Sequence, residues 1–352
     1  MIFKKIDIES RKEINKFLKI EDRKSCAYCF TDIFIWKDKY KTEFCIEDNC
    51  LYMRQFDIES NMYFYYAPII DNSREQTEGK ENDKDNGLKM SCGNNNENAR
   101  NNHEVITNCI NKIIIDSIDN NYQFCFGNIN QELSDFIIEE YGNIFEIEHV
   151  RDFSDYIYNS TDLINLSGKK FHKKKNLLNK FKRVYDGCYE YRDITSNDVK
   201  DILEFNKIWC ESNLTKDAED MADETKAIKL AMENFDALKL QGGMLLVNNK
   251  IIAYTLGSEI TRDTFGIQIE KALSEYAGAY QMINNAFAKN NLEKYKFINR
   301  EEDLGIEGLR KAKMSYNPVI IEDYIMAKCC CENVRKTYNL TRVKSRFCEV
   351  ER

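Results

Sequence analysis

The chain has 352 residues, a formal net charge of −8, 43% hydrophobic residues and 31% charged residues. The length favours two domains, each long enough to bury a core, and the composition excludes a disordered chain. The negative charge excludes a protein whose whole surface coats nucleic acid, although it allows a local basic site.

The N-terminal stretch MIFKKIDIESRKEINKF contains no apolar signal segment, and no run of about 18 apolar residues occurs in the chain. The 13 cysteines are irregularly spaced. We therefore expect a cytoplasmic protein with reduced thiols and no transmembrane segment. Cys26 and Cys29 form a lone C-x-x-C pair and the three histidines form no ligand motif, so we expect no metal.

The first half of the chain is predicted to alternate helices and strands. Apolar periodicity favours helices at 11–19, 105–118 and 131–140, and strands at 44–54, 62–70, 123–127 and 145–150. This alternation predicts one α/β layer structure. Residues 71–104 are almost free of apolar side chains and rich in Asn, Glu and Lys. Such a segment cannot offset its ordering entropy by burial, so we expect a disordered insertion within the first domain.

A basic segment, residues 168–185, separates the two halves. Lys or Arg fills eight of the fifteen positions from 169 to 183, and Phe171, Leu178 and Phe181 lie among them at roughly helical spacing. We place the domain boundary just before this segment, which gives an N-terminal domain of residues 1–160 and a C-terminal domain of residues 161–352.

The second half shows a clear order of elements. A helix is expected around residues 199–209, and apolar runs at 243–247 and 251–260 flank Asn248-Asn249, which indicates a β-hairpin. The pattern then predicts a strand at 264–270, a helix at 279–289, a strand at 295–300, a helix at 306–316 and a strand at 319–326.

This order resembles the core of the GCN5-related N-acetyltransferase (GNAT) fold. Four blocks sharpen the likeness: CFTDIFIWKDKY (29–40), GKKFHKKKNLLNKF (168–181), IQIEKALSEYAGAYQMINNAFA (267–288) and YKFINREEDLGIEGLRKAKMSYNP (295–318). Together they resemble a bacterial family related to the C-terminal domain of phosphatidylglycerol lysyltransferase, over nearly the whole chain apart from 71–104. The resemblance implies an α/β (α+β) protein of two tandem GNAT-like domains, each a mixed sheet flanked by helices.

The resemblance also implies a reaction, because better-understood relatives move an aminoacyl group from aminoacyl-tRNA to an amine or hydroxyl of a lipid or peptide. Acetyltransferase-like folds often keep a general base at the end of the strand that we predict at 264–270. Alternation places Gln268 and Glu270 on one face of that strand and Ile267 and Ile269 on the other. We expect Glu270 to be catalytic and Gln268 and Lys271 to contact substrate. The alternative is a Glu270 carboxylate held in a structural ion pair.

Polar residues are dense after the strand predicted at 295–300, at an edge where α/β folds bind ligands. We expect substrate-binding roles for Asn299, Arg300, Glu302 and Asp303, and also for Arg310 and Lys313 on the next helix. Tyr316 is a candidate to protonate a leaving group. For Asp303 the alternative is a cap for that helix, with Gly305 in the turn, and Tyr316 has the alternative of a core residue with a hydrated hydroxyl.

The segment Glu275-Tyr-Ala-Gly-Ala-Tyr280 lies where acetyltransferases carry the turn that holds the pyrophosphate of coenzyme A. Only Gly278 fits that turn, because Glu275 is anionic and Tyr280 is bulky. We keep Gly278 as a phosphate-contacting candidate, and the departure disfavours acetyl coenzyme A as donor.

The basic segment points to a polyanion instead. We expect Lys173, Lys174 and Lys175 to contact phosphates of an RNA, with aminoacyl-tRNA as donor and a lipid or small molecule as acceptor. A solvated helix face is the alternative explanation of these lysines. For the whole chain, the competing functions are an acyl-coenzyme-A-dependent N-acetyltransferase and a non-catalytic ligand-binding module on the same fold.

Overall fold

The computed structural model describes residues 1–71, 97–213 and 218–330, which fold into two compact units. Within these residues the first unit comprises 1–22, 40–71, 97–151 and 323–330. The second unit comprises 23–39, 152–213 and 218–322. The predicted single boundary at 160/161 is therefore corrected, because the units are built from interleaved segments and the central boundary lies between Arg151 and Asp152.

The first unit is built on an eight-stranded sheet. Its strands are β1 (Lys4–Lys5), β2 (Glu43–Glu47), β3 (Cys50–Asp57), β4 (Met62–Tyr65), β5 (Ile69–Ile70), β6 (Gln123–Ile129), β7 (Phe145–His149) and β15 (Ile325–Cys329). Its helices are α1 (Arg11–Glu21), α3 (Glu97–Asp119) and α4 (Gln131–Tyr141). Rings of Tyr65, Phe124 and Phe126 pack edge to face in its core.

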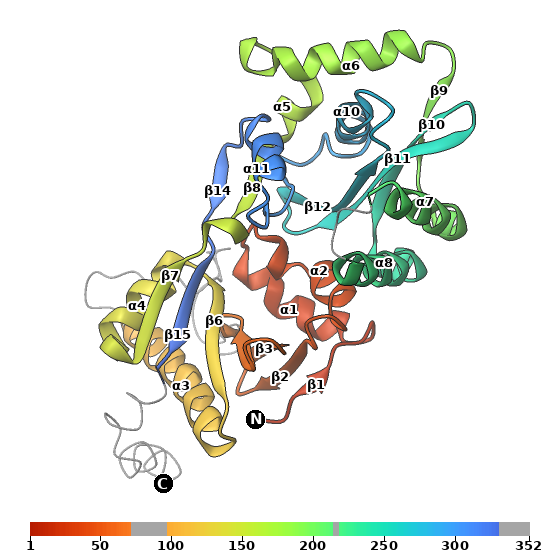
Figure 1. Cartoon of the computed structure of the whole chain (residues 1–352). Coiled ribbons are helices and arrows are strands. Elements are labelled where there is room, and N and C mark those ends of the chain that lie inside the picture. The colour runs from red at the N-terminus through yellow and green to blue at the C-terminus, as the bar shows by residue number, and fades with distance from the viewer. Residues whose placement is uncertain (72–96, 214–217, 331–352) are drawn as a thin grey trace, which may run out of the picture. The chain divides into compact units, whose positions relative to one another are not determined.

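The second unit is built on a seven-stranded sheet. Its strands are β8 (Asp155–Asn159), β9 (Tyr189–Asp193), β10 (Gln241–Val247), β11 (Lys250–Glu259), β12 (Thr264–Ala272), β13 (Phe297–Asn299) and β14 (Ile320–Glu322). Its helices are α2 (Phe30–Ile35), α5 (Ser160–Asn165), α6 (His172–Val184), α7 (Val199–Glu211), α8 (Ala218–Glu233), α9 (Phe235–Leu238), α10 (Ala279–Asn291) and α11 (Glu307–Met314). Figure 1 shows α10 between the sheet and α6, with α7 on the other side of the sheet.

Both sheets share one topology. The strand order is β1-β2-β3-β4-β6-β15-β7 in the first unit and β9-β10-β11-β12-β13-β8-β14 in the second. Each sheet is antiparallel except for one parallel pair, β4 with β6 and β12 with β13, and a helix (α3 or α10) connects the members of each pair. The expected class is confirmed: each unit is a GNAT-like mixed sheet flanked by helices.

The two sheets exchange strands through the chain. β8 follows β7 in sequence but lies between β13 and β14, whereas β15 follows β14 in sequence but lies between β6 and β7. The strand predicted at 319–326 is therefore wrong as a single element. Its apolar residues belong to β14 and β15, which pair in different sheets. Periodicity cannot detect this break, because pairing partners are set by contacts distant in sequence.

Several local predictions are confirmed. β10 and β11 form the expected antiparallel hairpin, and Asn248 and Asn249 turn it with φ of 50° and 61°, the left-handed backbone that such tight turns need.

The helix predicted at 105–118 begins earlier, at Glu97, so residues 97–104 of the predicted insertion are helical. Residues 72–96 of that insertion lie outside the described residues. No described helix is long and apolar enough to cross a membrane.

Candidate active site at the divergence of β12 and β13

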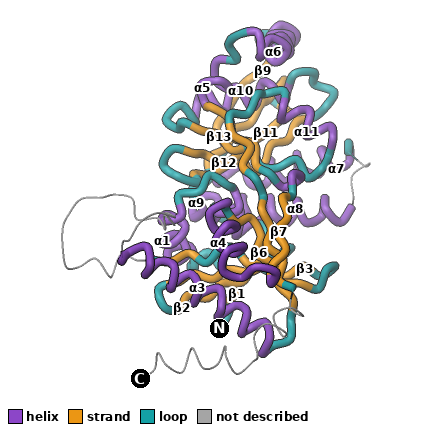
Figure 2. The backbone as a smooth tube through the Cα atoms, turned by 90° about the vertical axis from the view of Figure 1, so that its left-hand side faces the viewer, coloured by secondary structure: helices purple, strands orange, loops and turns teal. Residues whose placement is uncertain are grey.

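The parallel pair of the second unit opens along its length. β13 pairs with β12 only through Phe297–Asn299 against Thr264–Gly266, whereas β12 continues to Ala272. The second half of β12 therefore has no partner on this side, and the chain leaving β13 is free to turn toward it. Ligand crevices in α/β sheets commonly form beyond the carboxyl ends of diverging strands. Figure 2 shows β11, β12 and β13 side by side in this unit.

A β-bulge sets the direction of the side chains here. The register of β12 against β11 shifts between Gly257, opposite Ile267, and Leu256, opposite Ile269, so Gln268 is the extra residue. The predicted strict alternation of side chains between the two faces of this strand is therefore wrong beyond Gln268. Glu270 shares the α10 face of the sheet with Phe265, whose ring contacts Phe287 of α10. Bulges are frequent next to active sites, because they re-aim a side chain.

Glu270 lies in a short network of charged and amide groups. Its Oε1 accepts a hydrogen bond of 2.7 Å from Nη2 of Arg300, and its Oε2 accepts one of 3.1 Å from Nδ2 of Asn284. The two charged side chains are only 10% and 13% exposed. Burial lowers the pKa of Arg300, but the Glu270 charge outweighs it and the pKa is raised. Nη1 of Arg300 is buried and has no hydrogen-bond acceptor among the described residues.

An aromatic ring and a second cation complete the cluster. The ring of Tyr316 lies 4.8 Å from the Arg300 guanidinium carbon, and Nζ of Lys174 lies 4.0 Å from the same ring. Burial raises the pKa of the Tyr316 hydroxyl to about 12, so it keeps its proton at neutral pH. Burial, aided by the Arg300 charge, lowers the pKa of Lys174 to about 8. We call Glu270, Asn284, Arg300, Tyr316 and Lys174 the Glu270 site.

The remaining polar residues after β13 hold the backbone together. Asn299 is fully buried, and its Nδ2 donates to the Lys24 carbonyl at 2.7 Å and to Asp155 at 2.9 Å. Nζ of Lys313 donates to the carbonyls of Arg300 and Glu302. These contacts fix the turn that presents Arg300 to Glu270.

Asp303 and Arg310 form the second clamp of this turn. Both oxygens of the buried Asp303 accept from Arg310 at 2.8 Å, and Oδ1 also accepts from the Gly305 amide at 2.9 Å. Burial raises the pKa of Asp303, but the Arg310 hydrogen bonds outweigh it and lower the pKa to about 2. The alternative of a helix cap is wrong, because the N-cap of α11 is Ile306 and no side chain caps it. Asp303 instead accepts from the Gly305 amide and so shapes the turn before α11.

Glu302 belongs to a group of carboxylates with Glu301, Asp155 and Asp32 of α2. Burial, followed by repulsion from Asp155, raises the pKa of Glu302, and burial and Glu302 together raise that of Asp32. Among the described residues no set of three or more His, Cys, Asp or Glu side chains is arranged to hold a metal ion.

Lys271 and Gly278 lie in packed surroundings. Nζ of Lys271 is on the α7 face of the sheet, 3.6 Å from the centroid of the Trp209 ring and 2.8 Å from Glu224. Gly278 is the N-cap of α10 with φ of 93°, and a Cβ there would meet the Leu177 carbonyl oxygen of α6 at 2.6 Å. The start of α10 is thus covered by α6, so Gly278 is required for close packing of the two helices.

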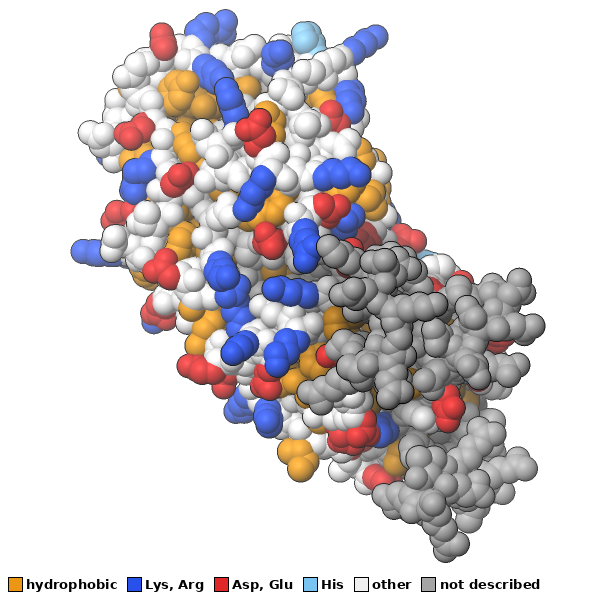
Figure 3. All heavy atoms as spheres, turned by 180° about the vertical axis from the view of Figure 1, so that it is seen from behind, with side chains coloured by type: hydrophobic (Ala, Val, Ile, Leu, Met, Phe, Trp, Pro, Cys, Tyr) orange, Lys and Arg blue, Asp and Glu red, His pale blue; other side chains and the backbone are white. Residues whose placement is uncertain are grey.

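The basic segment divides into an outer and an inner part. Lys173 and Lys175 are exposed, whereas Lys174 is half-buried at the Glu270 site. Of the other basic side chains of the segment, Lys170 pairs with Asp162 at 2.9 Å. Figure 3 shows Lys and Arg side chains along the upper edge of the view, where α6 runs in Figure 1.

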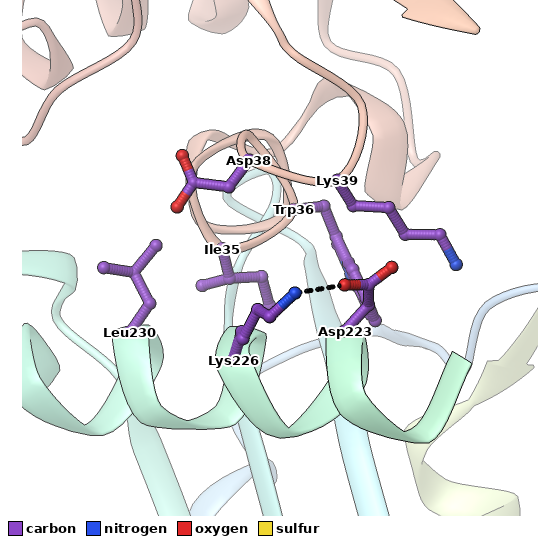
Figure 4. A pocket seen from close by; sticks show the side chains of 7 residues that line it. All are labelled: Ile35, Trp36, Asp38, Lys39, Asp223, Lys226 and Leu230. Atoms are coloured by element: carbon purple, nitrogen blue, oxygen red, sulfur yellow. Dashed lines mark hydrogen bonds and ion pairs between the residues drawn. The ribbon is translucent and has the colours of Figure 1, made fainter. Parts of the chain in front are cut away.

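A hollow with a volume of about 60 Å³ lies between α2 and α8. Its walls include Ile35, Trp36 and Leu230, and Lys226 crosses it to Asp223 at 2.8 Å (Figure 4). Because this ion pair is satisfied internally and the hollow is small, we assign no chemistry to it.

The sequence analysis did not predict Asn284 at the site, and it did not distinguish Lys174 from its neighbouring lysines. Only the position of Lys174 could have been recognised from the sequence. Phe171, Lys174, Leu178 and Phe181 recur at spacings of three and four, so Lys174 occupies the apolar stripe of α6. A lysine in such a stripe points toward the core side of its helix. Asn284 had no signal, because asparagine is common throughout this chain.

Comparison with known proteins gives one family. The model of the family described as phosphatidylglycerol lysyltransferase, C-terminal, matches residues 102–327, more than half of the chain. A curated relative, an uncharacterised protein of Mycoplasmoides gallisepticum, is 24% identical over 195 residues, covering 53% of this chain. The chain spans only 60% of that relative's length.

Two solved structures are similar to this protein over nearly the whole chain. A conserved protein of unknown function from Bacteroides thetaiotaomicron is 34% identical, with a TM-score of 0.79, and the match covers 94% of this chain and all of that one. The C-terminal domain of a putative lysylphosphatidylglycerol synthetase from Agrobacterium fabrum is 10% identical, with a TM-score of 0.58 and 91% of each chain covered. The second likeness shows a shared fold.

Proposed function

Because this chain belongs to the phosphatidylglycerol lysyltransferase C-terminal family, we propose that it transfers an aminoacyl group from aminoacyl-tRNA to an amine or hydroxyl acceptor. The acceptor is a lipid or a small molecule. The observation that carries this proposal is the Glu270 site, where a buried carboxylate, a protonated tyrosine hydroxyl and two cations converge beyond the open end of β13. Such a set supplies a base, an acid and electrostatic stabilisation to an acyl transfer.

Glu270 takes a proton from the acceptor amine or hydroxyl, whose nitrogen or oxygen attacks the ester carbonyl carbon. The bond from that carbon to the ribose oxygen breaks, and Tyr316 gives its proton to the leaving oxygen. The Arg300 guanidinium stays charged throughout, because Glu270 raises its pKa. It fixes the Glu270 carboxylate, which keeps lone pairs free for the acceptor proton.

Two features support tRNA as the donor rather than acetyl coenzyme A. The start of α10, where the resemblance places a pyrophosphate turn, is covered by the backbone of α6 at Leu177. On the outside of α6, Lys173, Lys175 and Lys180 are exposed and make no ion pair with any described residue, which favours a polyanion there.

The test is an equilibrium titration of the protein with charged tRNA, uncharged tRNA and acetyl coenzyme A at two salt concentrations. We expect tRNA binding that weakens with salt, with a log–log slope of roughly −0.7 to −0.9 per neutralised phosphate. The variant Lys173→Ala/Lys175→Ala should bind several-fold more weakly, whereas Lys4→Ala/Lys5→Ala, an exposed pair on β1, should bind like the wild type. Salt-tolerant binding of acetyl coenzyme A without tRNA binding would support the acetyltransferase alternative, and binding without any transfer would support the non-catalytic one.

A further inference from the structure

Lys174 differs from the other basic residues of α6. It lies four residues before Leu178 and seven before Phe181, which are buried in the same core cluster as residues of α10, so the helix directs it inward. Its Nζ lies 4.0 Å from the centroid of the Tyr316 ring, and no carboxylate forms an ion pair with it among the described residues. A lysine in such a position loses hydration, and the Glu270 carboxylate that attracts it is already bonded to Arg300 and Asn284.

The charges around Lys174 do not balance. The Glu270 carboxylate already accepts from Arg300 and Asn284, so a single anion faces two cations. Nη1 of Arg300 is buried beside the same Tyr316 ring and has no acceptor among the described residues. Buried charges and donors are normally paired. The Glu270 site therefore suits one further negative charge that brings acceptor oxygens.

The chemistry of the proposed reaction narrows the identity of this anion. The carboxyl group of an aminoacyl donor is esterified and carries no charge. The negative charge closest to that ester is a phosphodiester of the RNA end, and in a phospholipid acceptor it is the phosphodiester of the headgroup. In both sources the phosphodiester carries one negative charge on its oxygens. These oxygens can accept from one guanidinium N–H and one ammonium group.

We propose that Lys174 and Nη1 of Arg300 form a subsite that binds a phosphodiester of the substrate beside Glu270. This inference rests on the proposed function, since it assigns a charged group to a substrate of that same site. It makes Lys174 a substrate-binding residue of the reaction centre, distinct from the exposed lysines of α6 that face solvent.

The test follows the Lys174 ammonium directly by NMR of protein carrying ε-¹³C-lysine, with the signal identified by its loss in Lys174→Met. The ionisable groups that face it are Glu270, Arg300 and Tyr316. Two soluble probes distinguish the sources: the trinucleotide CpCpA for the donor and glycerophosphoglycerol for the acceptor. A bound phosphodiester favours the charged ammonium, so a saturating probe should raise the pKa of Lys174.

We expect Lys174→Met to weaken binding of whichever probe raises the Lys174 pKa by about tenfold, in line with the loss of one charged hydrogen bond. The matched control is Lys294→Met, which removes a lysine 4.7 Å from the Tyr295 ring of the same unit and should bind like the wild type. Thermal unfolding of Lys174→Met, expected to be as cooperative as that of the wild type, excludes misfolding. A response to either probe supports the subsite and identifies its source.

The subsite is overturned if neither probe moves the Lys174 signal, or if both variants bind equally well. Its failure is separable from that of the proposed function. Aminoacyl transfer with an unresponsive Lys174 removes the subsite alone, whereas a responsive Lys174 without transfer removes the proposed function alone.

Discussion

The two units each place an arginine among tyrosine rings beside a glutamate, yet the two guanidinium groups are bonded differently. In the first unit, Arg54 donates from Nε and Nη2 to Glu43 at 3.2 and 3.1 Å and from Nη1 to the Tyr65 hydroxyl at 3.1 Å. Its guanidinium also lies 3.7 Å from the centroid of the Phe3 ring. In the second unit, Nη1 of Arg300 has no acceptor within the part of the chain that the structure describes.

We interpret Arg54 as a structural arginine, whereas our proposal makes Arg300 a ligand-binding one. Arg54 joins three strands of its sheet and has its terminal nitrogens occupied, so it stabilises the fold. Arg300 donates from Nη2 to Glu270, whereas its Nη1 has no acceptor among the described residues. On a shared topology, our proposal places the chemistry in the unit whose arginine has a donor without an acceptor among the described residues.

The largest expected effect on stability comes from the structural arginine. Arg54→Met should lower the free energy of unfolding by about 3–5 kcal/mol, because Glu43 and Asp116 lose a buried counter-charge. Chemical denaturation measures this loss. Lys4→Met, on an exposed strand, is the control and should stay within about 0.5 kcal/mol of the wild type. A cost for Arg54→Met below about 1 kcal/mol would contradict the structural assignment.

A smaller effect of opposite sign is expected from the carboxylates near the Arg300 turn. Burial, with repulsion from Glu302 and Asp155, raises the pKa of Asp32 well above its ordinary value of 3.8. A raised folded-state pKa gives stability that is present below the ordinary pKa and is lost as the pH rises through the folded-state pKa.

Asp32→Asn removes the loss of stability that accompanies ionisation of Asp32. We therefore expect the free energy of unfolding to rise by about 1 kcal/mol at pH 7, and the difference to disappear near pH 4. Urea unfolding at both pH values measures it. A destabilised variant at pH 7 would show that the Asp32 carboxylate is favourably bound rather than strained.

The smallest effect concerns Lys174. Burial lowers its pKa from 10.5 to about 8, so between these pH values the unfolded chain holds a proton that the folded chain has released. Wild-type stability should therefore gain a contribution as the pH rises from 8 to 10.5. Lys174→Met should lack that contribution and be more stable at pH 7 by less than about 1 kcal/mol. Parallel pH profiles of the two proteins would disprove a dehydrated Lys174.

Much of the second unit was predictable from sequence, because its local signals agree with its fold. The hairpin at Asn248-Asn249 and the helix starting at Ala279 follow from turn chemistry and periodicity alone. What failed depends on contacts distant in sequence. The exchange of β8 and β15 between sheets leaves no local mark, and the bulge at Gln268 arises from pairing with β11.

The candidate site was predicted in part for the same reason. Glu270, Arg300 and Tyr316 lie in blocks that carry the family resemblance, and the structure brings them together. The predicted roles of Asn299, Asp303 and Lys313 rested on polarity alone, which cannot distinguish a ligand contact from a backbone clamp. Only three-dimensional partners make that distinction.

The most direct measurement compares the two glutamates in a transfer assay. Aminoacyl-tRNA with a labelled amino acid is incubated with the protein and with vesicles of phosphatidylglycerol or a mixture of small amines, and the label is followed from tRNA to acceptor. We predict transfer by the wild type, a rate at least about 100-fold lower for Glu270→Gln, and a rate within about twofold of the wild type for Glu43→Gln. Full activity of Glu270→Gln, or an equal loss in both variants, would contradict the assignment of the chemistry to the second unit.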